Sequence, residues 1–302
     1  MSDKRGKTNL QHQDLIFENN SISYKIYYYF YIMLRDKKEM NFLGIYILYI
    51  LETIQLMSYG LSEPHIDTWK ENSSTLEKIT DIIGILRITT LMKYIKFNIY
   101  IVIFFIIIVI IFALCIFMAV QILFFKESKL FINAINIFRI LIYPLSIFLF
   151  IPITELVLLP LKCNEDDKVD IVKEGIKCWE KIHYLYSILG IISSVLFLLY
   201  IIFLNSLFFY PYNYRDSSIR IQSNNDTIFI FIKFIFVLRF ILVKNEYFSI
   251  AILFIFSLYA LTQEFYEHTF NNNKLEIIIN IKYFLSFWTY FILLFSKFFK
   301  GK

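Results

Sequence analysis

Glycine, proline and charged residues are all scarce in this chain. Only 7 of its 302 residues are glycine and 5 are proline, and 18% are charged, whereas about a quarter of an ordinary soluble domain is charged. The few glycines exclude a collagen-like repeat and leave no glycine-rich phosphate loop, and the low polarity excludes intrinsic disorder. The net charge of +5 is spread over many loops, so nucleic acid is not an expected partner.

Histidine and cysteine are equally rare. The 4 histidines do not recur at metal-ligand spacing, and the 3 cysteines form no C-x-x-C pair. The chain also contains no H-E-x-x-H zinc motif and no G-x-S-x-G nucleophile turn. We therefore expect no metal, no haem or other cofactor, and no enzymatic activity.

Apolar residues are what the sequence has in excess. They make up 58% of the chain, 20% are aromatic, and the mean hydropathy is +0.60. A helix needs about 20 mostly apolar residues to cross a bilayer. Two long runs carry no charge, and five more segments carry a charge or a proline or are slightly short. The sequence predicts an all-α polytopic membrane helix bundle with about seven transmembrane helices, over 41–59, 97–125, 131–161, 184–209, 227–243, 248–263 and 277–296.

The flanking segments are more polar than the spans. Residues 1–39 are predicted to form a polar N-terminal tail and, over 21–34, a tyrosine-rich interfacial helix. Residues 79–95 are interpreted as a second interfacial helix. The bundle itself is expected to cover 40–296, followed by a basic tail over 297–302. The short link between the fifth and sixth spans predicts a helical hairpin, since one continuous helix would be far longer than a bilayer is thick.

Six ionisable residues inside the predicted spans are the candidate functional residues. Such groups are costly in lipid and usually mark a buried pair or a transport pathway. Glu52 lies near the middle of its span and must face protein, with Lys233 and Arg239 as its candidate partners, whereas Lys282 lies only about six residues into its span and is close enough to the span end to snorkel. A structural pair or a snorkelled, interface-facing group is the first interpretation, and a transport role or a protonated Glu52 are the alternatives. The six are Glu52, Arg139, Glu155, Lys233, Arg239 and Lys282.

Three prolines stand eight residues apart in the third predicted span, at Pro144, Pro152 and Pro160. An interior proline removes one backbone hydrogen bond and clashes with the preceding turn, so this helix should kink. A kinked helix is compatible with a moving element of a channel or transporter, or with a long tilted helix that bends to fit within the bilayer.

Cys163 and Cys178 lie in one loop and are a candidate disulfide, with two reduced thiols as the alternative. Cys115 lies inside a span and is interpreted as a small apolar residue. A disulfide would place this loop in an oxidising compartment and the N-terminus on the cytosolic side. The count of lysine and arginine in the loops favours neither orientation.

Several short segments carry a family resemblance through their order and spacing. Over about residues 40–245 they resemble the N-terminal membrane region of the tiny macrocysts protein B-related proteins, a large protist family. The segments are Glu52–Tyr59 (ETIQLMSY) with Trp69, Arg87–Thr89 (RIT), Phe97–Tyr100 (FNIY), Pro152–Glu155 (PITE), Cys163 with Ile176–Trp179 (IKCW), and Arg220–Ser223 (RIQS).

The resemblance implies a membrane-anchored sensor or signalling scaffold with a cytosolic C-terminus, although the PAS-type sensory region of the family does not occur within these 302 residues. With seven spans, that orientation conflicts with the one a disulfide implies. We expect a non-enzymatic multi-pass protein of the plasma membrane or an endomembrane, the anchoring or sensor module of a signalling assembly. Its partners would be the lipid bilayer and a second copy or other membrane proteins. The alternative function is an ion channel or transporter that uses the intramembrane charges.

Overall fold

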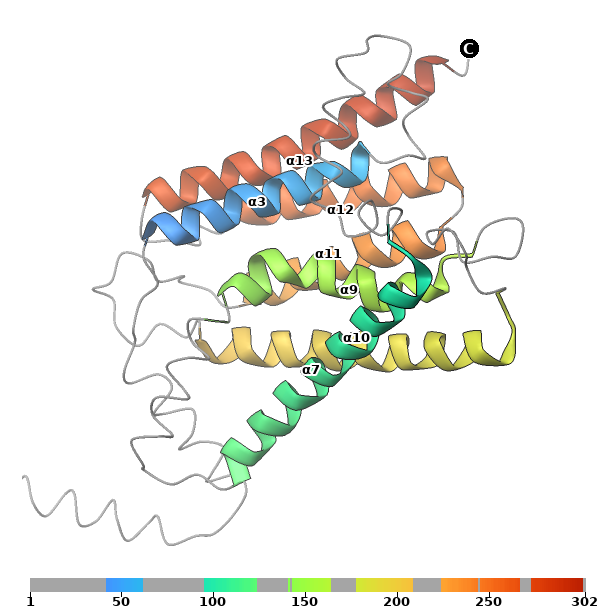
Figure 1. Ribbon diagram of the computed structural model, residues 1–302. Coiled ribbons are helices and arrows are strands. Elements are labelled where there is room, and N and C mark those ends of the chain that lie inside the picture. The colour runs from blue at the N-terminus through green and yellow to red at the C-terminus, as the bar shows by residue number, and fades with distance from the viewer. Residues whose placement is uncertain are drawn as a thin grey trace, which may run out of the picture.

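The described part of the chain is 94% helical. The structure is a computed structural model, and it describes residues 42–61, 95–123, 141, 143–163, 178–208, 224–243, 245–266 and 273–300. These residues form helices and no strand, which confirms the predicted all-α bundle (Figure 1). The N-terminal tail, both predicted interfacial helices up to residue 94, and Arg139 lie outside the described residues.

Within the described ranges, seven helical segments follow one another along the chain. The third is a composite of a π-helical turn (η2), an α-helix (α9) and a 3-10 turn (η3). In chain order they are α3 (Phe42–Gly60), α7 (Phe97–Leu123), η2 (Pro144–Leu149) with α9 (Phe150–Leu158) and η3 (Leu159–Leu161), α10 (Lys181–Phe208), α11 (Asn224–Leu242), α12 (Glu246–Tyr266) and α13 (Asn273–Lys300).

Six of these segments are long and apolar enough to cross a membrane, and α11 is the one that does not qualify by composition. It has 19 residues, which include Asp226, Lys233 and Arg239. Helix α11 nevertheless makes a full pass through the bundle. It connects α10 to α12, and both of these helices run in the direction opposite to α11 (Figure 1). The predicted hairpin of α11 and α12 is formed, and the Asn245 side chain caps α12 by accepting a hydrogen bond from the Phe248 N–H at 3.2 Å.

Helices α3 and α13 run side by side in the same direction. Glu52 of α3 is level with Lys282 of α13, and four residues further along Leu56 accepts a hydrogen bond from the Tyr290 hydroxyl. Beyond them, Gly60 packs against Thr289 and Tyr290. Because α3 and α13 point in the same direction, the chain from α3 to α13, with both helices counted, crosses the bundle an odd number of times.

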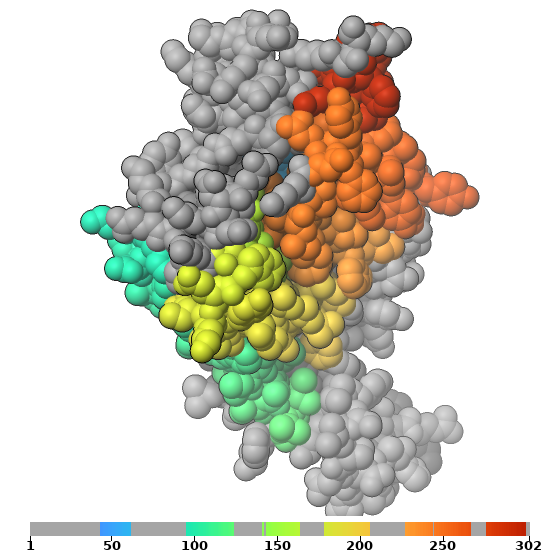
Figure 2. Space-filling view, turned by 90° about the vertical axis from the view of Figure 1, so that its right-hand side faces the viewer, coloured from blue at the N-terminus to red at the C-terminus, as the bar shows by residue number. Residues whose placement is uncertain are grey.

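Helix α7 shows why this bundle belongs in lipid. Every residue of its first 24 is apolar except an asparagine near its start and the tyrosine that follows two positions later. A narrow stripe is buried, at Tyr100, Phe104, Ile108 and Ile111, together with Gln121 near the end of the helix, and α7 packs against α9 and α10. Many of the other side chains are exposed, with Val109 64% exposed, and Figure 2 shows α7 on the flank of the molecule opposite α12. Such a surface is stable only in an apolar solvent.

The prolines of the third segment coincide with its irregular turns. Pro144 begins the π-helical turn and Pro160 lies in the 3-10 turn, while Pro152 lies inside α9. The predicted distortion is therefore present at two of the three prolines, and it follows from the missing N–H and the ring clash.

The last helix is longer than the predicted span at both ends. Helix α13 begins at Asn273, before the predicted residue 277, and continues to Lys300, so most of the predicted basic tail is helical. With 28 residues it is about 42 Å long, which exceeds the roughly 30 Å hydrocarbon layer and requires a tilted or projecting helix. Near its end Lys297 pairs with Glu246 at the start of α12.

Candidate functional site

Glu52 is the centre of a buried charge cluster. It is the eleventh residue of α3 and only 1% exposed. One carboxylate oxygen pairs with the Lys233 ammonium of α11, and the other accepts a hydrogen bond from the Lys282 ammonium of α13 at 3.0 Å. One side chain therefore joins three helices that are far apart in the sequence.

Lys233 also reaches the backbone of the proline-containing segment. Its ammonium donates to the Ser146 carbonyl at 2.9 Å and lies 3.5 Å from the Ile147 carbonyl. In a π-helical turn the Ile147 carbonyl would be paired with the backbone N–H five residues on, and that residue is Pro152, which has none. Lys233 thus supplies a donor to the Ile147 carbonyl, whose π-helical partner has no N–H, and a shorter bond to the neighbouring Ser146 carbonyl.

Lys282 lies among aromatic rings. Its ammonium is 4.1 Å from the ring centre of Tyr283, 5.1 Å from that of Tyr49 and 6.0 Å from that of Phe229. Ring faces attract a desolvated cation, so these contacts offset part of the cost of burying it. The prediction that Lys282 snorkels was wrong, since it is only 2% exposed. The early start of α13 makes it the tenth residue of its helix and places it deeper than expected.

A small cavity lies beside the three charges. It has a volume of about 30 Å³ and is lined by residues of α3, η2, α10, α11 and α13. Asn205 of α10 reaches it, is 2% exposed, and has a side-chain oxygen without a hydrogen-bond partner. A cavity of this size holds one water molecule or one small ion, and it is far below the several hundred cubic ångströms of an organic substrate site.

Glu155 and Arg239 lie apart from this cluster. Glu155 of α9 is fully buried and accepts a hydrogen bond from the Tyr59 hydroxyl of α3 at 2.6 Å. Arg239 is buried on α11, six residues beyond Lys233, and it is not among the ion partners of Glu52. The predicted alternative pairing of Glu52 with Arg239 was therefore wrong.

The sequence analysis missed the neutral members of the site. Asn205, Tyr49 and Tyr283 line the cavity together with the charged residues. Asn205 had a detectable signal, because an amide is rare within an otherwise apolar span and needs a polar partner there. The two tyrosines had none, since 22 tyrosines occur along the chain.

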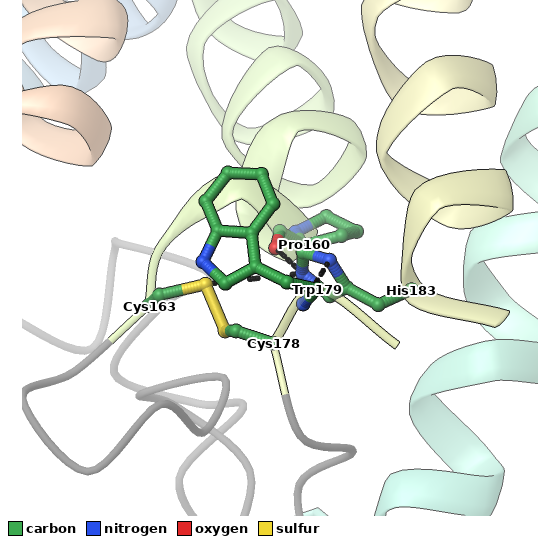
Figure 3. The surroundings of a disulfide bond; sticks show 5 residues. All are labelled: Pro160, Cys163, Cys178, Trp179 and His183. Carbon is green, nitrogen blue, oxygen red and sulfur yellow. Dashed lines mark hydrogen bonds between the residues drawn. A yellow bond between two sulfur atoms is a disulfide. The ribbon is translucent and has the colours of Figure 1, made fainter. Parts of the chain in front are cut away.

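Cys163 and Cys178 are joined by a disulfide at one end of the bundle (Figure 3). Beside it, His183 is buried and its Nε2 lies 2.7 Å from the Pro160 carbonyl oxygen. The Trp179 N–H donates to His183 Nδ1 at 3.2 Å, which fixes the ring proton on Nε2 and makes Nε2 the donor to Pro160. These contacts fasten the end of η3 to the start of α10.

The same two sulfurs and the His183 ring nitrogen lie within 4.8 Å of one another, a spacing that is compatible with a metal site. In this structure the sulfurs are bonded to each other, and both ring nitrogens already take part in hydrogen bonds. A metal needs thiolates and a free nitrogen lone pair. The cluster is therefore arranged as a covalent clamp between two helices.

No family model, no curated protein and no solved structure matches this chain.

Proposed function

We propose that the protein is a non-enzymatic, multi-pass membrane module that serves as the anchor or sensor part of a signalling assembly. The observation that carries the non-enzymatic part is the closed geometry around Glu52. Its carboxylate is used by two lysines, and the adjoining cavity of about 30 Å³ has no room for an organic substrate. The arrangement suits holding helices in place.

A buried ion cluster is suited to fixing one helix arrangement. Replacing such a cluster by apolar groups is often harmless to stability, but removing one partner is costly. Only the arrangement that brings α3, α11 and α13 together satisfies Glu52, Lys233 and Lys282 at once. Other rotations of these helices would leave a charge without its partner in lipid, and these are disfavoured.

The signalling part of the proposal rests on the sequence resemblance. Two of its segments, Glu52–Tyr59 and Pro152–Glu155, contact each other in the core through the hydrogen bond from Tyr59 to Glu155. The partners proposed for the module are the lipid bilayer and a second copy or another membrane protein. Its outward faces are apolar, as on α7, and are suited to both.

An ion channel or transporter is the second candidate. Transporter sites near mid-membrane are often built from broken helices whose free carbonyls face the site. Here the π-helical turn directs the Ser146 and Ile147 carbonyls at Lys233, beside the cavity. That geometry favours an ion as the transported species.

Ion flux from reconstituted vesicles separates the two candidates. The purified chain is placed in vesicles loaded with a pH-sensitive or halide-sensitive dye, with protein-free vesicles as the baseline. A non-transporting module leaves the flux at that baseline. Flux above the baseline that changes in Glu52→Gln but not in the rim variant Glu246→Gln would overturn the proposal and support the transporter.

A further inference from the structure

Trp179, two residues before α10 begins, has a left-handed backbone. Its φ is 69°, and no other residue has a positive φ in the part of the chain that the structure describes. In this region the Cβ of an L-residue crowds the following carbonyl oxygen, so a bulky residue is strained there, whereas glycine is not. Such a conformation persists only where neighbouring contacts hold it.

Two anchors hold Trp179, one on each side. It directly follows Cys178, which is bonded to Cys163, and its N–H donates to His183 Nδ1 at 3.2 Å (Figure 3). Side-chain burial contributes little, since Trp179 is 59% exposed and its ring lies 5.7 Å from the His183 ring and 5.8 Å from the Tyr184 ring, centre to centre. Opening the disulfide would therefore remove the covalent anchor and allow the backbone of Trp179 to relax.

The sulfur of Cys163 is the better placed of the two for exchange with an external thiol. Cys163 is partly exposed, whereas Cys178 is only 6% exposed. His183 Nε2 lies 3.9 Å from Cys163 Sγ, and it carries the ring proton because Nδ1 accepts the hydrogen bond from the Trp179 N–H. An N–H beside a sulfur stabilises its thiolate, the form in which sulfur attacks and leaves in thiol–disulfide exchange.

We propose that the Cys163–Cys178 disulfide is an exchange site for small thiols of the glutathione class, and that its reduction releases Trp179 from the left-handed conformation. A small thiolate attacks Cys163 Sγ and forms a mixed disulfide, while Cys178 leaves as a thiolate and takes up a proton. A second small thiolate then attacks the sulfur of the bound small thiol, and Cys163 leaves as a thiolate beside the His183 N–H. The protein disulfide gains two electrons, and the two small thiols are oxidised to their own disulfide. The exchange uses only this end of the bundle, so it does not depend on the proposed signalling role.

Equilibration of the full chain with glutathione tests the site without any substitution. The protein in detergent is held in mixtures of reduced and oxidised glutathione with a metal chelator, quenched with acid and alkylated, and the alkylated cysteines are counted by mass spectrometry. We expect the fraction of reduced Cys163 and Cys178 to rise with the proportion of reduced glutathione, since strained and accessible disulfides are the labile ones. A disulfide that stays closed at every ratio, and opens only in dithiothreitol, would overturn the proposal.

Two substitutions at Trp179 isolate the backbone strain. Trp179→Ala and Trp179→Gly both remove the indole, and they differ only in the Cβ that is strained in the left-handed region. Glycine should therefore make the disulfide harder to reduce than alanine does, by about fivefold or more in the equilibrium constant with glutathione. Equal constants, or easier reduction of Trp179→Gly, would overturn the release of Trp179. The control is Tyr184→Ala, which removes the neighbouring ring and should leave the constant close to that of the unaltered chain.

Single-cysteine variants test which sulfur reacts and what His183 contributes. In a Cys115→Ala background, Cys178→Ser leaves Cys163 alone and Cys163→Ser leaves Cys178 alone. We expect Cys163 to form a mixed disulfide with oxidised glutathione faster than Cys178 does. Adding His183→Leu to Cys178→Ser should slow this reaction at neutral pH but not at high pH, where the thiolate forms without the donor. Faster reaction at Cys178, or the same slowing at every pH, would refute the assigned roles.

Discussion

The substitution Glu52→Gln should be among the most destabilising single changes in the bundle. It keeps the shape of the side chain and removes only the charge that Lys233 and Lys282 share. Both ammonium groups then lose their carboxylate partner. Removing one partner of a buried ion pair costs about 3–5 kcal/mol, and for a chain of this size that corresponds to a fall in unfolding temperature of the order of 10 °C.

The cost should be reversible by further substitutions. Adding Lys282→Met to Glu52→Gln removes one of the two buried ammonium groups and should recover part of the lost stability, which gives a coupling well above 1 kcal/mol in a double-mutant cycle. The control is Glu246→Gln, which breaks the pair between Glu246 and Lys297. The Glu246 side chain is 37% exposed and the Lys297 side chain 19% exposed. A pair at the surface of this kind, although partly buried, is expected to contribute less than a fully buried one, about 1 kcal/mol.

The assay is thermal or denaturant unfolding of the purified protein in one detergent, with all variants in the same buffer. Tryptophan fluorescence follows the transition. The reasoning would be refuted if Glu52→Gln were no more destabilising than Glu246→Gln, or if the Glu52→Gln and Lys282→Met effects simply added.

Two further predictions concern helix contacts and the clamp. Gly190→Ala should destabilise the protein by about 1–3 kcal/mol, because its new Cβ would overlap the Val157 backbone carbonyl oxygen. Gly60→Ala meets only side-chain atoms at 3.1 Å and should destabilise it less. Unfolding of both variants checks this order, and a smaller effect of Gly190→Ala than of Gly60→Ala would contradict it. Denatured but unreduced protein should alkylate at Cys115 alone, since the other two cysteines are disulfide-bonded, and mass spectrometry showing three alkylated sites before reduction would exclude the clamp. Reduction should also lower stability by about 3 kcal/mol, the value for opening a loop of about 15 residues.

The sequence was sufficient to predict the helices because long runs of apolar residues identify them by composition alone. A run such as Phe97–Leu123 is apolar on every side and can only be a buried or membrane helix. The hairpin at Asn245 was predictable for a similar reason, because length alone forbids a continuous helix. These features depend on local residues and on the thickness of a bilayer.

The partners of the charges could not be predicted fully, because they depend on how each helix is rotated. In lipid an apolar helix has little periodicity to show which face points inward. Glu52 and Lys233 were chosen correctly because both lie in mid-span, but Lys282 was misplaced when the start of α13 was set too late. Asn205 acquires its role only from the position of α10 beside the cluster.

The central claim is that α3 and α13 run parallel and are joined through Glu52, so that the chain crosses the membrane an odd number of times from one to the other. Cysteine labelling at the two ends of the bundle tests this claim most directly. In a Cys115→Ala background, Leu43→Cys marks the start of α3 and Phe299→Cys marks the end of α13, and both positions are exposed. A membrane-impermeant maleimide applied to sealed, oriented vesicles should label one of them, and the other only after permeabilisation. Labelling of both positions from the same side would contradict the parallel pairing of α3 with α13 and the cluster that depends on it.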